Sequence, residues 1–127
     1  MQVTRNDVAR WIAEYERAWR EEDLDAVARL FGDDARYRVS PYEPAAVGHD
    51  AIRQLWRGDA GRAFSMQAVV VAVEGDVAVA RVDVVYETPV VQEYKDVWIL
   101  RFAPDGRATE YEEWAYWPDK PFIAPAG

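Results

Sequence analysis

The N-terminal half of the chain repeats apolar residues at steps of three and four, the spacing of a helix buried along one face. Thr4, followed by Asp7 three residues later, resembles a capping box at the start of such a helix. The acidic run at residues 21–23 marks its end. The apolar stripe between these signals consists of Val8, Trp11, Ile12, Tyr15 and Trp19.

Two further helices are expected before residue 62. The first carries the apolar positions of residues 24–31 and stops at Gly32. A short strand at residues 35–39 follows, and Pro41 and Pro44 then impose an irregular loop. The next helix opens at residues 48–50 and ends among the glycines of residues 58–61.

Beyond residue 65 the pattern changes to valine-rich strands, at residues 66–74, 77–87, 90–102 and 107–117. The turns Gly75-Asp76 and Asp105-Gly106 separate them as hairpins. Residues 118–127 read as a proline-rich tail. Helices followed by a strand meander predict a single α+β domain over residues 1–127, with helices on one face of a curved, mostly antiparallel sheet.

The strand at residues 77–87 has one wholly apolar face and one face that carries Arg81 and Asp83. Two orientations are open. The charged face points to solvent, or it lines a cavity beneath the helices. We base our site hypothesis on the second, which leaves an apolar outer patch and therefore predicts a homodimer. That patch comprises Val82, Val84, Tyr86, Val97, Ile99, Trp114 and Tyr116.

Composition narrows the function classes. With 15 basic and 23 acidic residues the net charge is −8, which disfavours nucleic acid and anionic membranes as partners. The chain has no cysteine and a single histidine, His49, so we expect no metal site and no cofactor. No apolar run approaches the length of a membrane span, and the N-terminus lacks a signal peptide. A cytoplasmic location is the expectation.

Two segments carry a resemblance to a known superfamily. The stretch EEDLDAVARLFGDDARYRVSPYEPAAVGHDAI and the closing DVWILRFAPDGRATEYEEW resemble the nuclear-transport-factor-2-like superfamily. Its members include ketosteroid isomerases, SnoaL-like polyketide cyclases, scytalone dehydratase and limonene-1,2-epoxide hydrolase. The resemblance covers roughly residues 8–117 and implies a cone-shaped barrel, with the N-terminal helices packed in the concave face of the sheet.

The closest catalytic match is to limonene-1,2-epoxide hydrolase. Arg81-Val82-Asp83 resembles that family's Arg-x-Asp motif, and Glu113 stands where the family has a second aspartate. Tyr37 matches a tyrosine that holds the attacking water. Val39 replaces an asparagine that also binds this water. The resemblance therefore implies a catalytic set of Arg81, Asp83, Glu113 and Tyr37.

The match to ketosteroid isomerase is weaker. Tyr15 stands where that family has its oxyanion-hole tyrosine, but Val39 or Ser40 occupies the position of the general base. Aromatic residues and one further acid remain as candidate walls of a ligand pocket. The expected pocket residues are Tyr15, Trp19, Trp56, Tyr94, Asp96, Trp98 and Val39.

Two carboxyls in one pocket can divide acid and base roles if one is protonated and the other ionised. We assign Glu113 as base, Asp83 as acid, Arg81 as the bridge and Tyr37 as a water ligand. The same three charged residues also fit an ordinary cross-strand ion pair. The resulting hypothesis is an enzyme that uses acid–base chemistry on a hydrophobic small molecule, with epoxide hydrolysis as its most specific version. The alternatives are a non-catalytic binding module and a cyclase, isomerase or dehydratase of the same superfamily.

Overall fold

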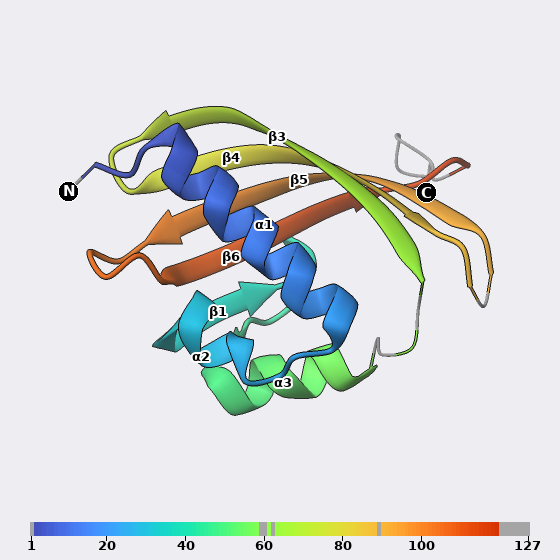
Figure 1. Ribbon diagram of the computed structural model, residues 1–127, viewed down its shortest axis with the longest axis horizontal. Coiled ribbons are helices and arrows are strands. Elements are labelled where there is room, and N and C mark those ends of the chain that lie inside the picture. Colours follow the sequence, from blue (N-terminus) through green and yellow to red (C-terminus); the bar gives the residue numbers. More distant parts are fainter. Residues whose placement is uncertain (1, 59–60, 62, 89, 120–127) are drawn as a thin grey trace, which may run out of the picture.

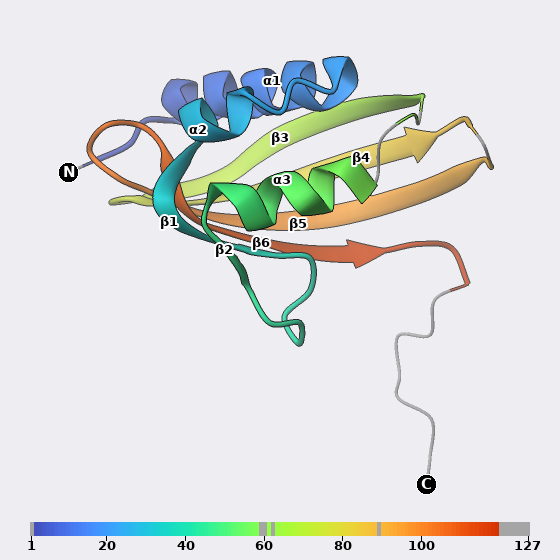
Figure 2. The same ribbon diagram turned by 90° about the horizontal axis from the view of Figure 1, so that it is seen from below.

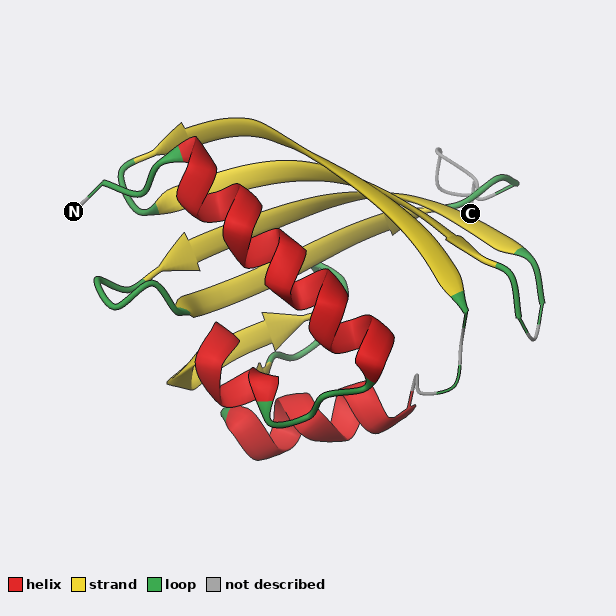
Figure 3. Cartoon of the chain, in the orientation of Figure 1, coloured by secondary structure: helices red, strands yellow, loops and turns green. Residues whose placement is uncertain are grey.

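Three helices cover one face of a curved sheet in the computed structural model, which describes residues 2–58, 61, 63–88 and 90–119 (Figures 1 and 3). The helices are α1 (Arg5–Glu21), α2 (Ala26–Leu30) and α3 (His49–Gly58). The strands are β1 (Phe31–Arg38), β2 (Ala46–Val47), β3 (Phe64–Glu74), β4 (Val77–Tyr86), β5 (Gln92–Phe102) and β6 (Ala108–Tyr116). The α+β class with helices on one face is confirmed. Of the predicted tail at residues 118–127, all but Pro118 and Asp119 lies outside the described residues.

Helix α1 forms as its sequence pattern predicts. The Thr4 side chain accepts from the Asp7 amide while the Asp7 carboxylate accepts from the Thr4 amide, which completes the capping box. Glu22 ends the helix in the left-handed conformation. The buried stripe of α1 lies against the sheet and consists of Val8, Trp11, Ile12, Tyr15 and Ala18.

The six strands follow the order β2-β1-β6-β5-β4-β3, so the two edges do not meet and the sheet is open rather than a closed barrel. Strands β3 to β6 form the predicted antiparallel meander. Strand β1 pairs with β6 in parallel, a long-range contact that the sequence pattern did not indicate. Gly32 does not stop a helix as expected. It lies within β1, which begins at Phe31.

The expected orientation of β4 is wrong. Its apolar face points inward, with Ala80 and Val82 fully buried, whereas Arg81 is exposed. Asp83 points outward too, where its Oδ2 lies 3.8 Å from Nζ of Lys95. Val84 is also buried rather than part of an outer patch. The reason is energetic, because this orientation buries aliphatic surface and leaves both charged groups hydrated.

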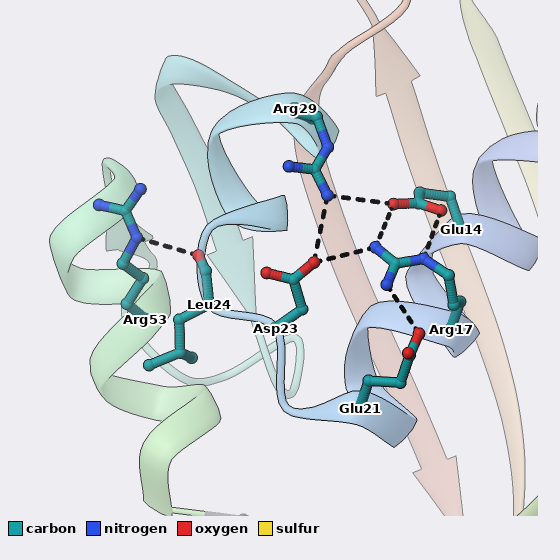
Figure 4. A network of polar contacts seen from close by, with 7 residues as sticks. All are labelled: Glu14, Arg17, Glu21, Asp23, Leu24, Arg29 and Arg53. Atoms are coloured by element: carbon teal, nitrogen blue, oxygen red, sulfur yellow. Dashed lines mark hydrogen bonds and ion pairs between the residues drawn. The ribbon is translucent and has the colours of Figure 1, made fainter.

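A network of ion pairs joins the helices (Figure 4). Arg17 on α1 binds Glu14, Glu21 and Asp23 at 2.6, 2.7 and 3.1 Å. Arg29 on α2 reaches Asp23 at 3.2 Å. From α3, Nε of Arg53 donates to the Leu24 carbonyl at 3.1 Å. These contacts hold α2 and α3 beside the C-terminal end of α1 and thereby fix one wall of the cavity described next.

Candidate active site

A cavity of about 280 Å³ lies between the helices and the concave face of the sheet, on the side of the sheet that Figure 2 shows covered by α1 and α3. Its walls are mostly aromatic. Among the described lining residues the only ionisable groups besides tyrosine are two carboxylic acids, Asp96 and Glu113. The lining residues are Tyr15, Trp19, Tyr37, Val39, Leu55, Trp56, Phe64, Met66, Val84, Tyr86, Tyr94, Asp96, Trp98, Tyr111 and Glu113.

Asp96 is the buried acid of this cavity. It lies on β5, opposite Val82 of β4 and Ala115 of β6, with 6% of its surface exposed. Its Oδ1 makes no hydrogen bond within the described part of the chain. Burial raises the pKa of Asp96 to about 6, whereas hydrogen-bonding groups on Glu113 and Trp98 act in the opposite direction. Asp96 therefore exchanges its proton close to neutral pH.

Glu113 is the second acid and lies diagonally from Asp96 on the neighbouring strand, because it pairs with Trp98 in the β5–β6 ladder. The Tyr111 hydroxyl donates to Oε2 of Glu113 at 2.9 Å. A hydrogen bond of this kind stabilises the ionised carboxylate. Both acids therefore have hydrogen-bonding groups beside them, and burial in addition desolvates Asp96.

Three buried tyrosines, Tyr15, Tyr37 and Tyr111, lie near Glu113. The hydroxyls of Tyr15 and Tyr37 share a hydrogen bond of 2.8 Å, and the rings of Tyr37 and Tyr111 stack with centroids 4.3 Å apart. Burial and the nearby Glu113 charge raise the pKa of Tyr37. Burial likewise raises the pKa of Tyr15 and of Tyr111. All three hydroxyls therefore stay protonated at neutral pH and can donate hydrogen bonds.

The structure brings most of the predicted site residues together. Tyr37 and Glu113 line the cavity, as do all seven predicted pocket residues: Tyr15, Trp19, Trp56, Tyr94, Asp96, Trp98 and Val39. Arg81 and Asp83 do not, because they lie on the opposite face of the sheet. The acid that faces Glu113 is Asp96, not Asp83.

Sequence reasoning overlooked Tyr111, which supplies the hydrogen bond to Glu113. The signal was available, since Tyr111 and Glu113 are two residues apart on one strand and so share a face. It also overlooked Val84 and Tyr86 as cavity walls, because both had been assigned to the outer face.

A second hollow of about 460 Å³ lies at the start of α1 and beside the β5–β6 turn. It is larger, but the charged residues at its rim are already paired, Arg10 with Asp7 and Arg29 with Glu14. Within the described ranges, no three His, Cys, Asp or Glu residues lie close enough to hold a metal ion. No helix among these residues is long and apolar enough to cross a membrane.

Solved structures share this architecture. A protein of unknown function with a cystatin-like fold from Methylobium petroleophilum matches at a TM-score of 0.75 and 19% identity, covering 98% of this chain and 86% of its own. A candidate ketosteroid isomerase from Kribbella flavida matches at a TM-score of 0.68 and 14% identity. The match covers 96% of this chain and 84% of the isomerase chain. An LEH-like epoxide hydrolase from Mycobacterium tuberculosis matches at a TM-score of 0.67 and 18% identity. The match covers 87% of this chain and 84% of the hydrolase chain. At these identities the likeness establishes the fold alone.

A search of curated proteins found no match to the chain. The family model of the SnoaL-like domain, in contrast, matches residues 8–111. This region spans α2, α3, all of α1 after Asp7, and most of the sheet. It includes Asp96 and Tyr111 and ends before Glu113. The chain belongs to the SnoaL-like domain family.

Proposed function

We propose that the protein is an enzyme that uses general acid–base chemistry on an uncharged hydrophobic small molecule, with Asp96 and Glu113 as the reacting pair. One observation carries the proposal. Asp96 is a carboxyl buried in an aromatic cavity beside a second carboxyl, with its pKa raised to about 6. Acid–base catalysis works best with groups that titrate near the working pH, and such perturbed acids concentrate at functional sites.

Cavity size and charge define the substrate class. A cavity of about 150 Å³ holds one benzene molecule, so about 280 Å³ suits a molecule of roughly two fused rings. The described ionisable lining groups other than tyrosine are acids, which repel an anionic substrate. The aromatic walls supply apolar contacts, and the tyrosine hydroxyls offer donors to a substrate oxygen.

The environments of the two acids assign their roles. Glu113 receives a hydrogen bond from Tyr111, so it is the ionised base. Burial raises the pKa of Asp96 to about 6, so we assign Asp96 as the acid. In epoxide hydrolysis, Glu113 takes a proton from water as the water oxygen bonds to carbon. The C–O bond breaks, and Asp96 protonates the departing oxygen. In an isomerisation, Glu113 takes a proton from carbon while Asp96 protonates the substrate oxygen to give an enol. Glu113 then returns the proton to another carbon as Asp96 takes back the O–H proton.

The proposal can be tested by incubating the purified protein with a panel of two-ring compounds and measuring turnover. Uncharged epoxides are followed by mass spectrometry for addition of water, and enolisable ketones by NMR for exchange of a carbon-bound hydrogen with deuterium. We expect wild-type turnover of at least one class, and losses of about 100-fold or more in Asp96→Asn and Glu113→Gln. Asp83→Asn is the matched control, since it makes the same change on the outer face, and should keep wild-type activity.

Two outcomes would redirect the proposal. Full activity in both Asp96→Asn and Glu113→Gln would remove the pair from the mechanism. Saturable binding of several compounds without turnover of any would favour the non-catalytic binding module. The hydrogen bond between the hydroxyls of Tyr15 and Tyr37 supports that alternative, because these two groups are already paired with each other without a substrate.

A further inference from the structure

Three buried polar atoms around the aromatic cavity have no partner in the described part of the chain. They are Nε1 of Trp56, Oδ1 of Asp96 and Nε1 of Trp98, and none of the three makes a hydrogen bond there. All three residues line the same cavity, and each is at most 6% exposed. Proteins pair about 90% or more of their buried polar groups, because an unpaired one is costly. The three atoms therefore mark where the cavity is suited to bind polar groups of another molecule.

Other tryptophans of the chain do not combine these properties. Trp11 is also buried, but its indole N–H donates to the Leu30 carbonyl at 2.9 Å. Trp19 also lines the cavity, but it has no buried N–H without a partner. Trp56 and Trp98 thus differ from both, since each presents a buried and unpaired N–H donor at the cavity wall.

The Trp98 donor lies beside the buried acid. Asp96 and Trp98 are two residues apart on β5 and so share a face of the strand. Burial raises the pKa of Asp96, and the Trp98 indole acts in the opposite direction, which places its N–H close to the carboxyl. One oxygen of a bound molecule can therefore accept from the indole N–H and exchange a proton with Asp96.

The Trp56 donor lies at a second point of the cavity. Trp56 belongs to α3 and Trp98 to the sheet, so the two indoles come from opposite walls (Figure 2). Burial is the main cause of the raised pKa of Tyr37, whereas groups on Tyr15 and Trp56 act in the opposite direction. The Trp56 N–H thus lies near the paired tyrosine hydroxyls. This point offers donors and fits an oxygen that only accepts hydrogen bonds, such as a carbonyl or ether oxygen.

We infer that the substrate carries two oxygen acceptors and that the indole N–H groups of Trp56 and Trp98 select for them. Trp98 binds the oxygen to which Asp96 gives its proton, and Trp56 binds a second, carbonyl or ether oxygen. The substrate class is thus a two-ring compound with oxygens at two separate positions. The assignment of Trp98 to the reacting oxygen rests on the proposed function, whereas recognition of the two oxygens is measurable without turnover.

The inference can be tested by isothermal titration calorimetry with pairs of ligands that differ by one oxygen. In the first pair, a methoxy-1-tetralone is compared with the ethyl-1-tetralone of the same pattern, and the substituent is placed on each aromatic carbon in turn. In the second pair, the best methoxytetralone is compared with the methoxytetralin that lacks its carbonyl. We expect the wild type to prefer the oxygenated member of each pair about tenfold, because its analogue leaves a buried N–H unpaired.

Trp56→Phe and Trp98→Phe should each abolish one of the two preferences and keep the other. Comparing the two ligands of a pair within one variant cancels any general loss of packing. Trp19→Phe is the matched control, since Trp19 lines the same cavity without a buried unpaired N–H. It should change the affinity for both members of a pair alike and so keep both preferences. Circular dichroism of each variant confirms that it remains folded.

Equal affinities within every pair in the wild type would overturn the inference, as would a panel that does not bind at all. Preferences that both survive in Trp56→Phe and in Trp98→Phe would overturn it too, because other groups would then recognise the oxygens. These outcomes are separate from those of the proposed function. Two oxygen preferences without turnover of any compound would remove the acid–base role and keep the recognition of two oxygens. Turnover that Asp96→Asn abolishes, without any oxygen preference, would do the reverse.

Discussion

The two faces of the sheet each hold an aspartate close to a charged residue, yet the two aspartates differ in every physical respect. Asp83 lies outside beside Lys95, in contact with water. Asp96 lies directly on the neighbouring strand, 6% exposed, beside Glu113 among aromatic rings. Burial is the main cause of the raised pKa of Asp96. Which face a residue occupies therefore decides whether it can do chemistry.

Filling the inner cavity should have the largest effect. Met66 and Val69 lie on β3, the first on the cavity wall and the second on the outer face. Met66→Trp should occupy space that a ligand needs and weaken binding of prodan, an uncharged naphthalene fluorophore, by at least about tenfold. Val69→Trp adds a similar volume outside and should leave binding unchanged. Fluorescence titration measures both, and equal affinities in the two variants would place the ligand elsewhere.

The second-largest expected effect is the change of kcat with pH. If Asp96 acts as the acid, kcat falls above about pH 6, by up to tenfold per pH unit, as Asp96 loses its proton. Asp83→Asn should leave this profile unmoved. A profile that instead rises through pH 6 would exchange the roles of Asp96 and Glu113.

Asp96→Asn should raise stability although it lowers activity. The pKa of Asp96 is higher in the folded chain than in the unfolded chain, so its ionisation opposes folding. This cost is absent below about pH 4, grows until about pH 6 and then stays constant. Asp96→Asn should therefore raise the free energy of unfolding at pH 7.5 by about 3 kcal/mol. Urea unfolding at pH 7.5 and pH 4 measures the difference, which should vanish at the lower pH.

Asp83→Asn provides the comparison for that measurement and should change stability little at either pH, because exposed pairs contribute little. An equal gain in both variants would show that burial of Asp96 is not the cause.

The smallest effect concerns the exposed network around Arg17. Hydrogen bonds from Arg17 lower the pKa of Glu14 and of Asp23 below their ordinary values. Their contribution is present at neutral pH and is lost as the pH falls through the acid range in which both carboxyls bind protons. Arg17→Ala should lower the melting temperature slightly in low salt and not in 1 M salt, as differential scanning fluorimetry can show.

Much of the fold was predictable from local pattern. The capping box at Thr4, the buried stripe of α1 and the strand meander follow from spacing alone. The parallel pairing of β1 with β6 was not predictable, because Tyr37 and Tyr111 are far apart in sequence and no local signal couples them. Gly32 looked like a helix stop, but the following residues pair with β6 and extend the strand instead.

The candidate site was predictable in part, and the error has one origin. Glu113 and Asp96 are both predictable as acids on strands, and the alternation of β5 predicts that Tyr94, Asp96 and Trp98 share a face. Asp83 was chosen over Asp96 because a motif resemblance outweighed the apolar alternation of β4. Alternation fixes which residues share a face but does not say which face is covered. The wholly apolar face of β4, which includes Val82 and Val84, is the face whose burial is favourable.

Asp96 and Glu113 are carried by adjacent strands within one hydrogen-bonded ladder, whereas Leu55 and Trp56 come from α3 and Val39 from the segment after β1. The two acids thus belong to the hydrogen-bonded sheet, whereas parts of the cavity wall belong to separate segments. Substitutions at Leu55 or Val39 can change the shape of the cavity, and so which molecules fit it, without moving the two carboxyls relative to each other. Under the proposed function, this division would let the cavity accommodate new molecules while the acid pair keeps its geometry.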